Sequence, residues 1–120
     1  MNGSLRELAG LISFPVAIAA GQILFKRAAA QLGPASGASW VLDLALLPTM
    51  WLALALYAGA TLLWVRILTT VPLSRAYPFM ALAFVLVPAA GYLFFNESIT
   101  VRYAAGTLLI IAGVVVVARA

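Results

Sequence analysis

Apolar residues gather in four long blocks along the chain, and short polar stretches separate them. The blocks extend over about residues 8–28, 44–68, 73–95 and 101–118. Each is close to the roughly 20 residues that cross the hydrocarbon core of a bilayer. The pattern predicts an all-α, polytopic membrane protein with four transmembrane helices that form a single domain over residues 1–120. Because the connections are short, neighbouring helices are expected to be antiparallel.

Helix-breaking and polar residues mark the ends of these blocks. The first connection contains Gly33-Pro34, Ser36-Gly37 and Ser39, and a turn at Thr69-Thr70-Val71-Pro72 precedes the third block. Asn96-Glu97-Ser98 ends the third block, which makes Ser98 or Thr100 a candidate N-cap of the last helix. Asp43 suits either a loop or the start of a helix.

The first block could also be interpreted as a signal peptide, because a basic start precedes apolar residues and the small residues Ala17 and Ala19. The apolar region continues past any cleavage point to Phe25, which favours a retained transmembrane helix.

Basic residues near the helix ends give only a small preference for one orientation. The side of the two termini holds Arg6, Arg66, Arg75 and Arg119, and the other side holds Lys26, Arg27 and Arg102. This small excess favours cytoplasmic termini and leaves insertion in both orientations open.

Composition narrows the classes of function. Of the 120 residues, 66% are hydrophobic and 8% are charged, so no soluble domain of any size is predicted. The absence of cysteine and histidine excludes a thiol nucleophile and removes the commonest general base and metal ligands. We therefore expect no enzymatic activity, no cofactor and no metal site. The net charge of +4 is too sparse for nucleic acid and suits anionic lipid.

Gln22 and Lys26 are the clearest polar pair inside a predicted span. They are four residues apart and so share a helix face. Lys26 lies at the membrane boundary, where its ammonium group could reach the interface without any further role. The deeper Gln22 amide needs a partner, which is either another helix or a water-containing cavity.

Two prolines interrupt the third block. Pro78 and Pro88 each remove a helical hydrogen bond and leave the carbonyl groups of Ser74 and Phe84 unpaired. Such a kinked helix suits a cavity wall or a moving gate, and a kink that serves packing alone remains an alternative. After the third block, Glu97 is expected to pair with Arg102, five residues further on, and the alternative without a functional role is a solvated loop ion pair of little energetic value.

The last block carries a stripe of small residues. Gly106 and Gly113 are seven residues apart on one face, with Ala105 and Ala112 beside them. Small residues allow helices to approach closely, so we expect a helix–helix contact here, either within one chain or between two chains.

Several short motifs in this order resemble the drug/metabolite transporter superfamily over essentially the whole chain. They are Ala20-Gly21-Gln22, Lys26, Val71-Pro72, Ala76-Tyr77-Pro78, Phe84-Val85, Glu97 and Arg102. Within this superfamily the chain is most similar to the small subunits that flip aminoarabinose-phosphoundecaprenol, and less similar to the small multidrug resistance transporters. In the latter a membrane-embedded glutamate exchanges protons for a cationic drug, and Ile18 occupies the aligned position here. No acid lies deep in any predicted span, which argues against a drug/proton antiporter.

The resemblance implies a flippase for an undecaprenyl-phosphate-linked monosaccharide, possibly an amino sugar, in a bacterial inner membrane. A homodimer, or a heterodimer with a similar small subunit, is implied as the assembly. Lys26 would bind the phosphate, Gln22 and Tyr77 the sugar hydroxyl groups, and Glu97 an amino group, and the candidate substrate-binding residues together are Gln22, Lys26, Arg75, Tyr77, Glu97 and Arg102. The alternatives are a small-solute or drug exporter and an accessory subunit whose partner supplies the site.

Overall fold

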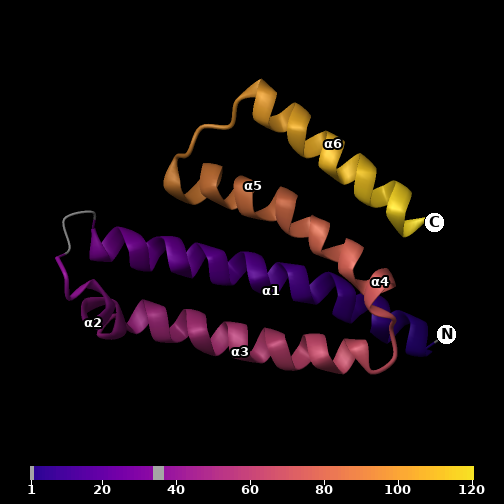
Figure 1. Ribbon diagram of the computed structural model, residues 1–120, viewed down its shortest axis with the longest axis horizontal. Helices are drawn as coiled ribbons and strands as arrows, with labels where there is room; N and C mark the ends of the chain where they lie inside the picture. Colours follow the sequence, from indigo (N-terminus) through magenta and orange to yellow (C-terminus); the bar gives the residue numbers. More distant parts are fainter. Residues whose placement is uncertain (1, 34–36) are drawn as a thin grey trace.

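The computed structural model describes residues 2–33 and 37–120 of the chain, which are helical apart from short turns (Figure 1). Within this part, four segments are long and apolar enough to cross a membrane: Leu5–Leu32, Pro48–Leu68, Leu73–Phe95 and Val101–Ala118. The all-α class with four membrane-spanning segments is therefore confirmed, and the chain is a multi-pass membrane protein. That it forms one domain over residues 1–120 stays a prediction. Pro34 and Ser36, assigned to the first connection from sequence, lie outside the described residues.

Helix α1 (Asn2–Leu32) has 31 residues and is longer than the predicted first span. At about 1.5 Å per residue it extends over roughly 46 Å, which exceeds the hydrocarbon thickness of about 30 Å. The helix must therefore tilt or project from the apolar layer at its ends. Gly33 ends it with a φ of 80°, a left-handed conformation that glycine adopts without steric cost.

The second block is not one continuous helix from residue 44, as predicted, but two. A short helix α2 (Trp40–Ala45) precedes α3 (Pro48–Leu68). Proline suits the first turn of a helix and forces the residue before it to be extended, so Pro48 starts a new helix after the extended Leu47. The Trp51 indole donates a hydrogen bond to the Ala45 carbonyl at 2.6 Å, which ties the two segments together. Asp43 lies in the first turn of α2.

The third block consists of α4 (Leu73–Ala76), the 3-10 segment η1 (Tyr77–Leu82) and α5 (Ala83–Phe95). Pro78 lies at the start of η1, and Pro88 lies inside α5. Helix α6 (Val101–Ala118) begins after Thr100, whose hydroxyl oxygen accepts the Tyr103 N–H at 3.0 Å. Thr100 rather than Ser98 is thus the N-cap.

The core lies between the antiparallel helices α1 and α3 and continues to η1 (Figure 1). The Phe14 ring stacks on Trp64 with 4.6 Å between the ring centroids. The small residues Ala53 and Ala60 of α3 are almost fully buried, and such residues let helix backbones approach closely. The buried members of this core are Leu11, Phe14, Ala60, Ile67, Val71 and Ala76.

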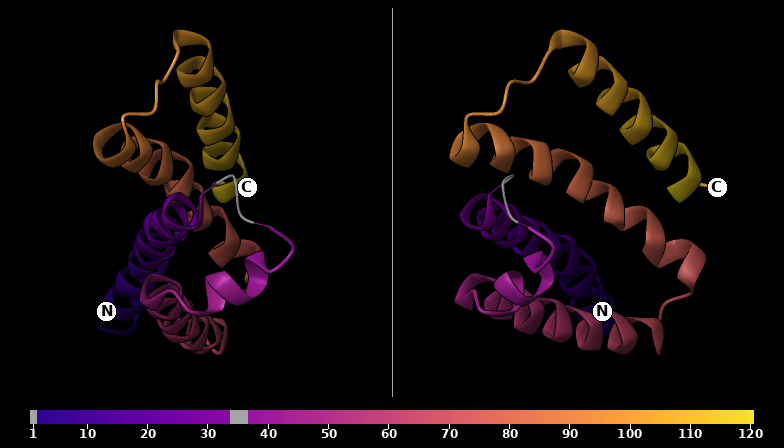
Figure 2. Two further views of the ribbon diagram at one scale, coloured as in Figure 1. Left: turned by 90° about the vertical axis from the view of Figure 1, so that its left-hand side faces the viewer. Right: turned by 60° about the vertical axis from the view of Figure 1, so that its left-hand side comes forward.

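Helix α6 lies at the edge of the molecule, beside α5 and η1 (Figure 2). None of its residues is buried. Its half-buried residues Thr107, Ile111 and Val114 share one face, and the rest of its apolar surface is exposed. Such a surface is suited to lipid or to a second membrane protein.

Candidate functional site

The Gln22 amide on α1 has a partner on α3. Its Nε2 donates a hydrogen bond to the Tyr57 hydroxyl at 2.6 Å. Gly21 makes this possible, because a Cβ at this position would overlap the Tyr57 ring. Phe25, one turn further along α1, packs on the same ring with 5.0 Å between the centroids. The second N–H and the carbonyl oxygen of Gln22 make no hydrogen bond within the described chain, so they remain available to a ligand.

Lys26 lies one turn from Gln22 and pairs with Glu97. Its Nζ is 3.7 Å from Glu97 Oε2, and each side chain is 53% exposed. Glu97 thus pairs with Lys26, and the pairing with Arg102 expected from sequence is not found among the described residues. A half-exposed pair at this distance is weak, so a charged ligand could replace either partner.

The end of α5 brings Glu97 to this position. Asn96 has a φ of 54°, and the Glu97 N–H bonds to the Gly91 carbonyl at 3.1 Å. This left-handed turn folds the chain back over the last turn of α5. The Glu97 carboxylate then lies against Gly91, where a Cβ would overlap its Oε1. The turn therefore directs Glu97 towards Lys26 on α1.

Gln22, Lys26 and Glu97 line a cavity of about 200 Å³ between α1 and α5. Two further cavities, of about 260 Å³ and 420 Å³, continue from it towards the start of α6. The three share lining residues, and we call them together the lateral groove. Pro88 and Tyr103 line the part nearest α6. Small-ligand sites usually have several hundred cubic ångströms of space, so the groove is large enough for a polar head group.

The lateral groove combines charge at one end with an apolar wall. Lys26 offers a cation, Glu97 an anion, and Gln22 neutral hydrogen-bonding groups. Ile18 lines the wall beside Gln22. No group of three or more histidine, cysteine, aspartate or glutamate residues that could hold a metal was found in the described part of the chain. The arrangement suits reversible binding of a zwitterionic or phosphorylated polar group.

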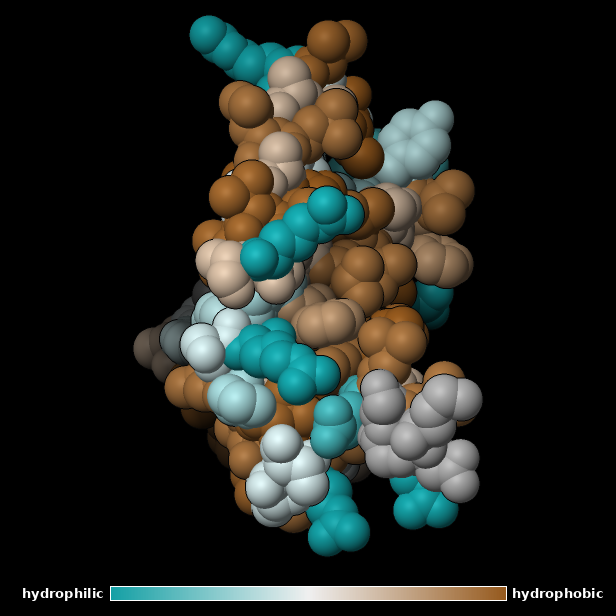
Figure 3. Space-filling model, turned by 90° about the vertical axis from the view of Figure 1, so that its right-hand side faces the viewer, coloured by the Kyte–Doolittle hydropathy of each residue, from teal (hydrophilic) through white to brown (hydrophobic). Residues whose placement is uncertain are grey.

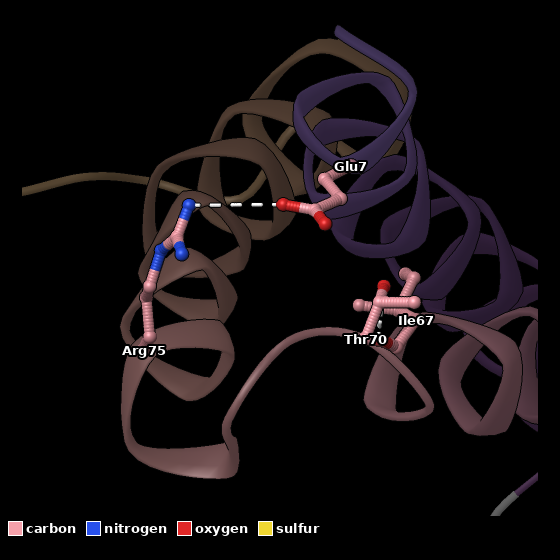
Figure 4. Close-up of polar contacts among 4 residues, drawn as sticks. All are labelled: Glu7, Ile67, Thr70 and Arg75. Atoms are coloured by element: carbon pink, nitrogen blue, oxygen red, sulfur yellow. Dashed lines mark hydrogen bonds and ion pairs between the residues drawn. The ribbon is translucent and has the colours of Figure 1, made fainter. Parts of the chain in front are cut away.

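The other predicted substrate-binding residues lie outside the lateral groove. Arg75 is on α4, with its Nη2 3.7 Å from Glu7 Oε2 (Figure 4). Tyr77 is 62% exposed in η1, and Arg102 is an exposed residue in the first turn of α6. The structure thus brings together Gln22, Lys26 and Glu97 and does not join the other three to them.

Two tyrosines of the site were not identified from the sequence. The Tyr57 hydroxyl accepts a hydrogen bond from the Gln22 amide, and Tyr103 lines the groove from α6. Each tyrosine places a hydroxyl group inside an apolar block of the sequence. Such a hydroxyl finds a hydrogen-bond partner when it is buried, and this was the one feature that could have identified them. Nothing in the spacing of either tyrosine connects it to Gln22.

The glycine stripe does not pack against another helix of this chain. A Cβ at Gly106 or Gly113 would meet no described atom within 4 Å. Both glycines lie away from the face of Thr107, Ile111 and Val114 that contacts the bundle. Their predicted role in helix packing remains a prediction, and it now concerns a contact between chains.

Comparison with known proteins supports the resemblance inferred from the motifs. The chain is 31% identical over 100 residues to the probable 4-amino-4-deoxy-L-arabinose-phosphoundecaprenol flippase subunit ArnE of Hamiltonella defensa, covering 81% of this chain and 90% of the relative. The ArnE protein of Sodalis glossinidius is 40% identical over 97 residues, which are 79% of this chain and 81% of the relative. The Pseudomonas aeruginosa (strain UCBPP-PA14) protein is 44% identical over 72 residues, which cover 60% of this chain and 63% of the relative.

No protein-family model matches the chain, and no solved structure matches it. The relatives are named as probable flippase subunits, and so as transport proteins rather than enzymes. With two of them aligned over about four-fifths of its length, the chain belongs to the family of ArnE-type flippase subunits.

Proposed function

We propose that this chain is a subunit of a flippase for undecaprenyl-phosphate-linked 4-amino-4-deoxy-L-arabinose, and that the lateral groove binds the head group. The substrate class comes from the names of the relatives. The Lys26–Glu97 pair is the observation that supports it most directly, because it places opposite charges 3.7 Å apart at the end of a groove. This head group carries both an anionic phosphate and a cationic amine.

Binding would exchange one ion pair for two. The substrate phosphate would replace the Glu97 carboxylate at Lys26, and the sugar ammonium group would replace Lys26 at Glu97. Because the resident pair is half exposed, breaking it costs little. The free N–H and carbonyl oxygen of Gln22 would bind sugar hydroxyl groups one helical turn deeper. The polyprenyl tail would stay in the lipid beside the groove, because transferring it into water is unfavourable.

Two finer features belong to the same proposal. We place the protein in the bacterial inner membrane, and we propose that it works as a dimer with a second copy or a similar small subunit. Arg75, Tyr77 and Arg102 lie outside the groove, so any contact of theirs with substrate requires a second conformation or a second subunit.

The proposal is tested by titrating purified variants with two lipid-linked sugars. One is polyprenyl-phosphate aminoarabinose, and the other is its analogue with a hydroxyl group in place of the amine. Lys26→Ala should weaken binding of both by about 1.5 to 3 kcal/mol, as expected for a lost charged hydrogen bond. Glu97→Gln should weaken binding of the amino sugar only, because Lys26 still binds the phosphate of both lipids in this variant.

Arg27→Ala provides the matched control, since Arg27 is the neighbouring cation on α1 and does not line the groove. It should bind both lipids like the wild type. Unchanged binding in Lys26→Ala and Glu97→Gln would contradict the site assignment. The chain would then be better explained as an accessory subunit whose partner supplies the site.

A further inference from the structure

A second polar cavity lies at the other end of the molecule, where α1 begins and α3 ends. Its volume is about 340 Å³, and its polar lining residues are Arg6 and Glu7 of α1 together with Arg66, Thr69 and Thr70. Figure 3 views this end of the molecule and shows hydrophilic side chains standing among apolar ones. The proposed head-group site does not include any of these residues.

The cavity has an excess of positive charge. Glu7 is the only acid that lines it, and its carboxylate is already paired with Arg75 at 3.7 Å (Figure 4). Arg6 and Arg66 have no ion-pair partner among the described residues. Two arginines that form no ion pair with the described residues therefore line one cavity.

The other polar groups of the cavity are already hydrogen-bonded to the end of α3. The Thr69 hydroxyl donates to the Arg66 carbonyl at 2.6 Å. The Thr70 hydroxyl donates to the Ile67 carbonyl at 3.4 Å (Figure 4). The backbone N–H groups of Thr69 and Thr70 bond to the same carbonyls at 3.2 Å and 3.1 Å. These carbonyls do not need the Arg66 side chain as a cap. The donors left for a ligand are the guanidinium groups of Arg6 and Arg66.

Guanidinium groups bind phosphate well because their planar fork of N–H donors matches two phosphate oxygens. The position of the cavity suits a lipid phosphate. Arg6 and Lys26 lie on the same helix and are separated by about 30 Å, which is the thickness of the hydrocarbon core. We therefore place the cavity at the membrane boundary opposite Lys26, where its apolar lining residues Leu63 and Ile67 would contact the acyl chains of a lipid.

We propose that Arg6 and Arg66 together bind a phosphate group in this cavity. Membrane lipid head groups and free phosphate share this chemistry. The site does not depend on the proposed function of the lateral groove, because the two cavities share no lining residue.

The test measures binding of dioctanoyl phosphatidic acid to the full-length protein in a neutral detergent by native mass spectrometry. Arg6→Gln and Arg66→Gln should each lower the affinity about tenfold or more, as for a lost charged hydrogen bond. Arg66→Lys should retain part of the affinity, because lysine keeps the positive charge but lacks the planar fork of N–H donors. Glu7→Gln should bind more tightly, because it removes the only anion of the cavity.

Arg119→Gln is the matched control, because it removes a positive charge at the end of α6 without altering the cavity lining. It should bind phosphatidic acid within about twofold of the wild type, as expected for an exposed, screened charge that does not line the cavity. Dioctanoylglycerol, which lacks phosphate, should not bind in an Arg6-dependent way. Competition by millimolar inorganic phosphate would identify the free anion as the ligand, and its failure to compete would identify the lipid. An equal loss in Arg119→Gln, or wild-type binding in both Arg6→Gln and Arg66→Gln, would overturn the proposal.

Discussion

The Gln22–Tyr57 hydrogen bond explains how an amide is accommodated inside an apolar helix. The sequence left two partners open for Gln22, another helix or a cavity, and the structure supplies both. One N–H donates to Tyr57 at 2.6 Å, and the rest of the amide lines the lateral groove. Hydrogen bonds of this kind between transmembrane helices contribute about 0.6 kcal/mol on average. The bond therefore positions the amide more than it stabilises the fold.

A double-mutant cycle of Gln22→Leu and Tyr57→Phe tests this division of roles. We expect a coupling free energy of about 0.6 kcal/mol, measured from unfolding in mixed micelles followed by circular dichroism. Gln22→Leu should also weaken binding of the lipid-linked sugar, because it removes the free N–H and carbonyl oxygen. Tyr57→Phe should retain most of that binding. A coupling near zero would contradict the hydrogen bond, and unchanged binding by Gln22→Leu would leave the amide with a structural role only.

Part of the site was accessible from sequence, and part was not. The spacing of Gln22 and Lys26 placed them on one face, because helix periodicity is a local property. The partner of Lys26 depends on how α5 packs on α1 and on the left-handed turn at Asn96. Proximity along the chain favoured Arg102 instead, which is why the pairing predicted for Glu97 was wrong.

Among the elements, the hydropathy pattern predicted the four spanning segments, but the break between α2 and α3 was missed. Length and apolar character determine whether a segment can cross a bilayer, so these segments are visible in sequence. The break before Pro48 had a local signal, because proline prefers the first turn of a helix. The 3-10 geometry of η1 had a weaker signal in the sequence. Pro78 predicts an interrupted helix but does not specify the form of the interruption.

The turn between α5 and α6 positions Glu97, and Asn96 is the residue on which it depends. Asn96→Ala should destabilise the protein by about 1 kcal/mol, because a left-handed conformation is unfavourable for alanine. It should also weaken binding of the amino sugar, since Glu97 would shift away from Lys26. Asn96→Gly should retain both properties, because glycine adopts this conformation freely. Unfolding in micelles and lipid titration measure the two effects, and equal behaviour of the two variants would contradict this role of the turn.

At the scale of the whole molecule, the described chain is a flat arrangement of helices with extents of 51 × 36 × 22 Å. Helix α6 contributes no buried residue, and the lateral groove is open at Lys26 and Glu97. A protein with so much exposed apolar surface needs lipid or another membrane protein around it. The membership of the chain in a family of flippase subunits is consistent with a partner on α6, where two glycines lie unpacked.

Replacing both Gly106 and Gly113 by leucine should therefore separate chains without unfolding them. A Cβ at either position meets no described atom within 4 Å, so the added side chains should not disturb the fold, but they would block close approach of a second helix. Cross-linking in membranes measures the association, and circular dichroism of the purified variant measures the fold. Ala105→Leu/Ala112→Leu is the control, because at about 100° per residue it adds the same bulk to another exposed side of α6. If the glycine variant cross-links like the wild type, the stripe is not the interface. If it loses its helical signal, the glycine face of α6 packs within the chain and not between chains.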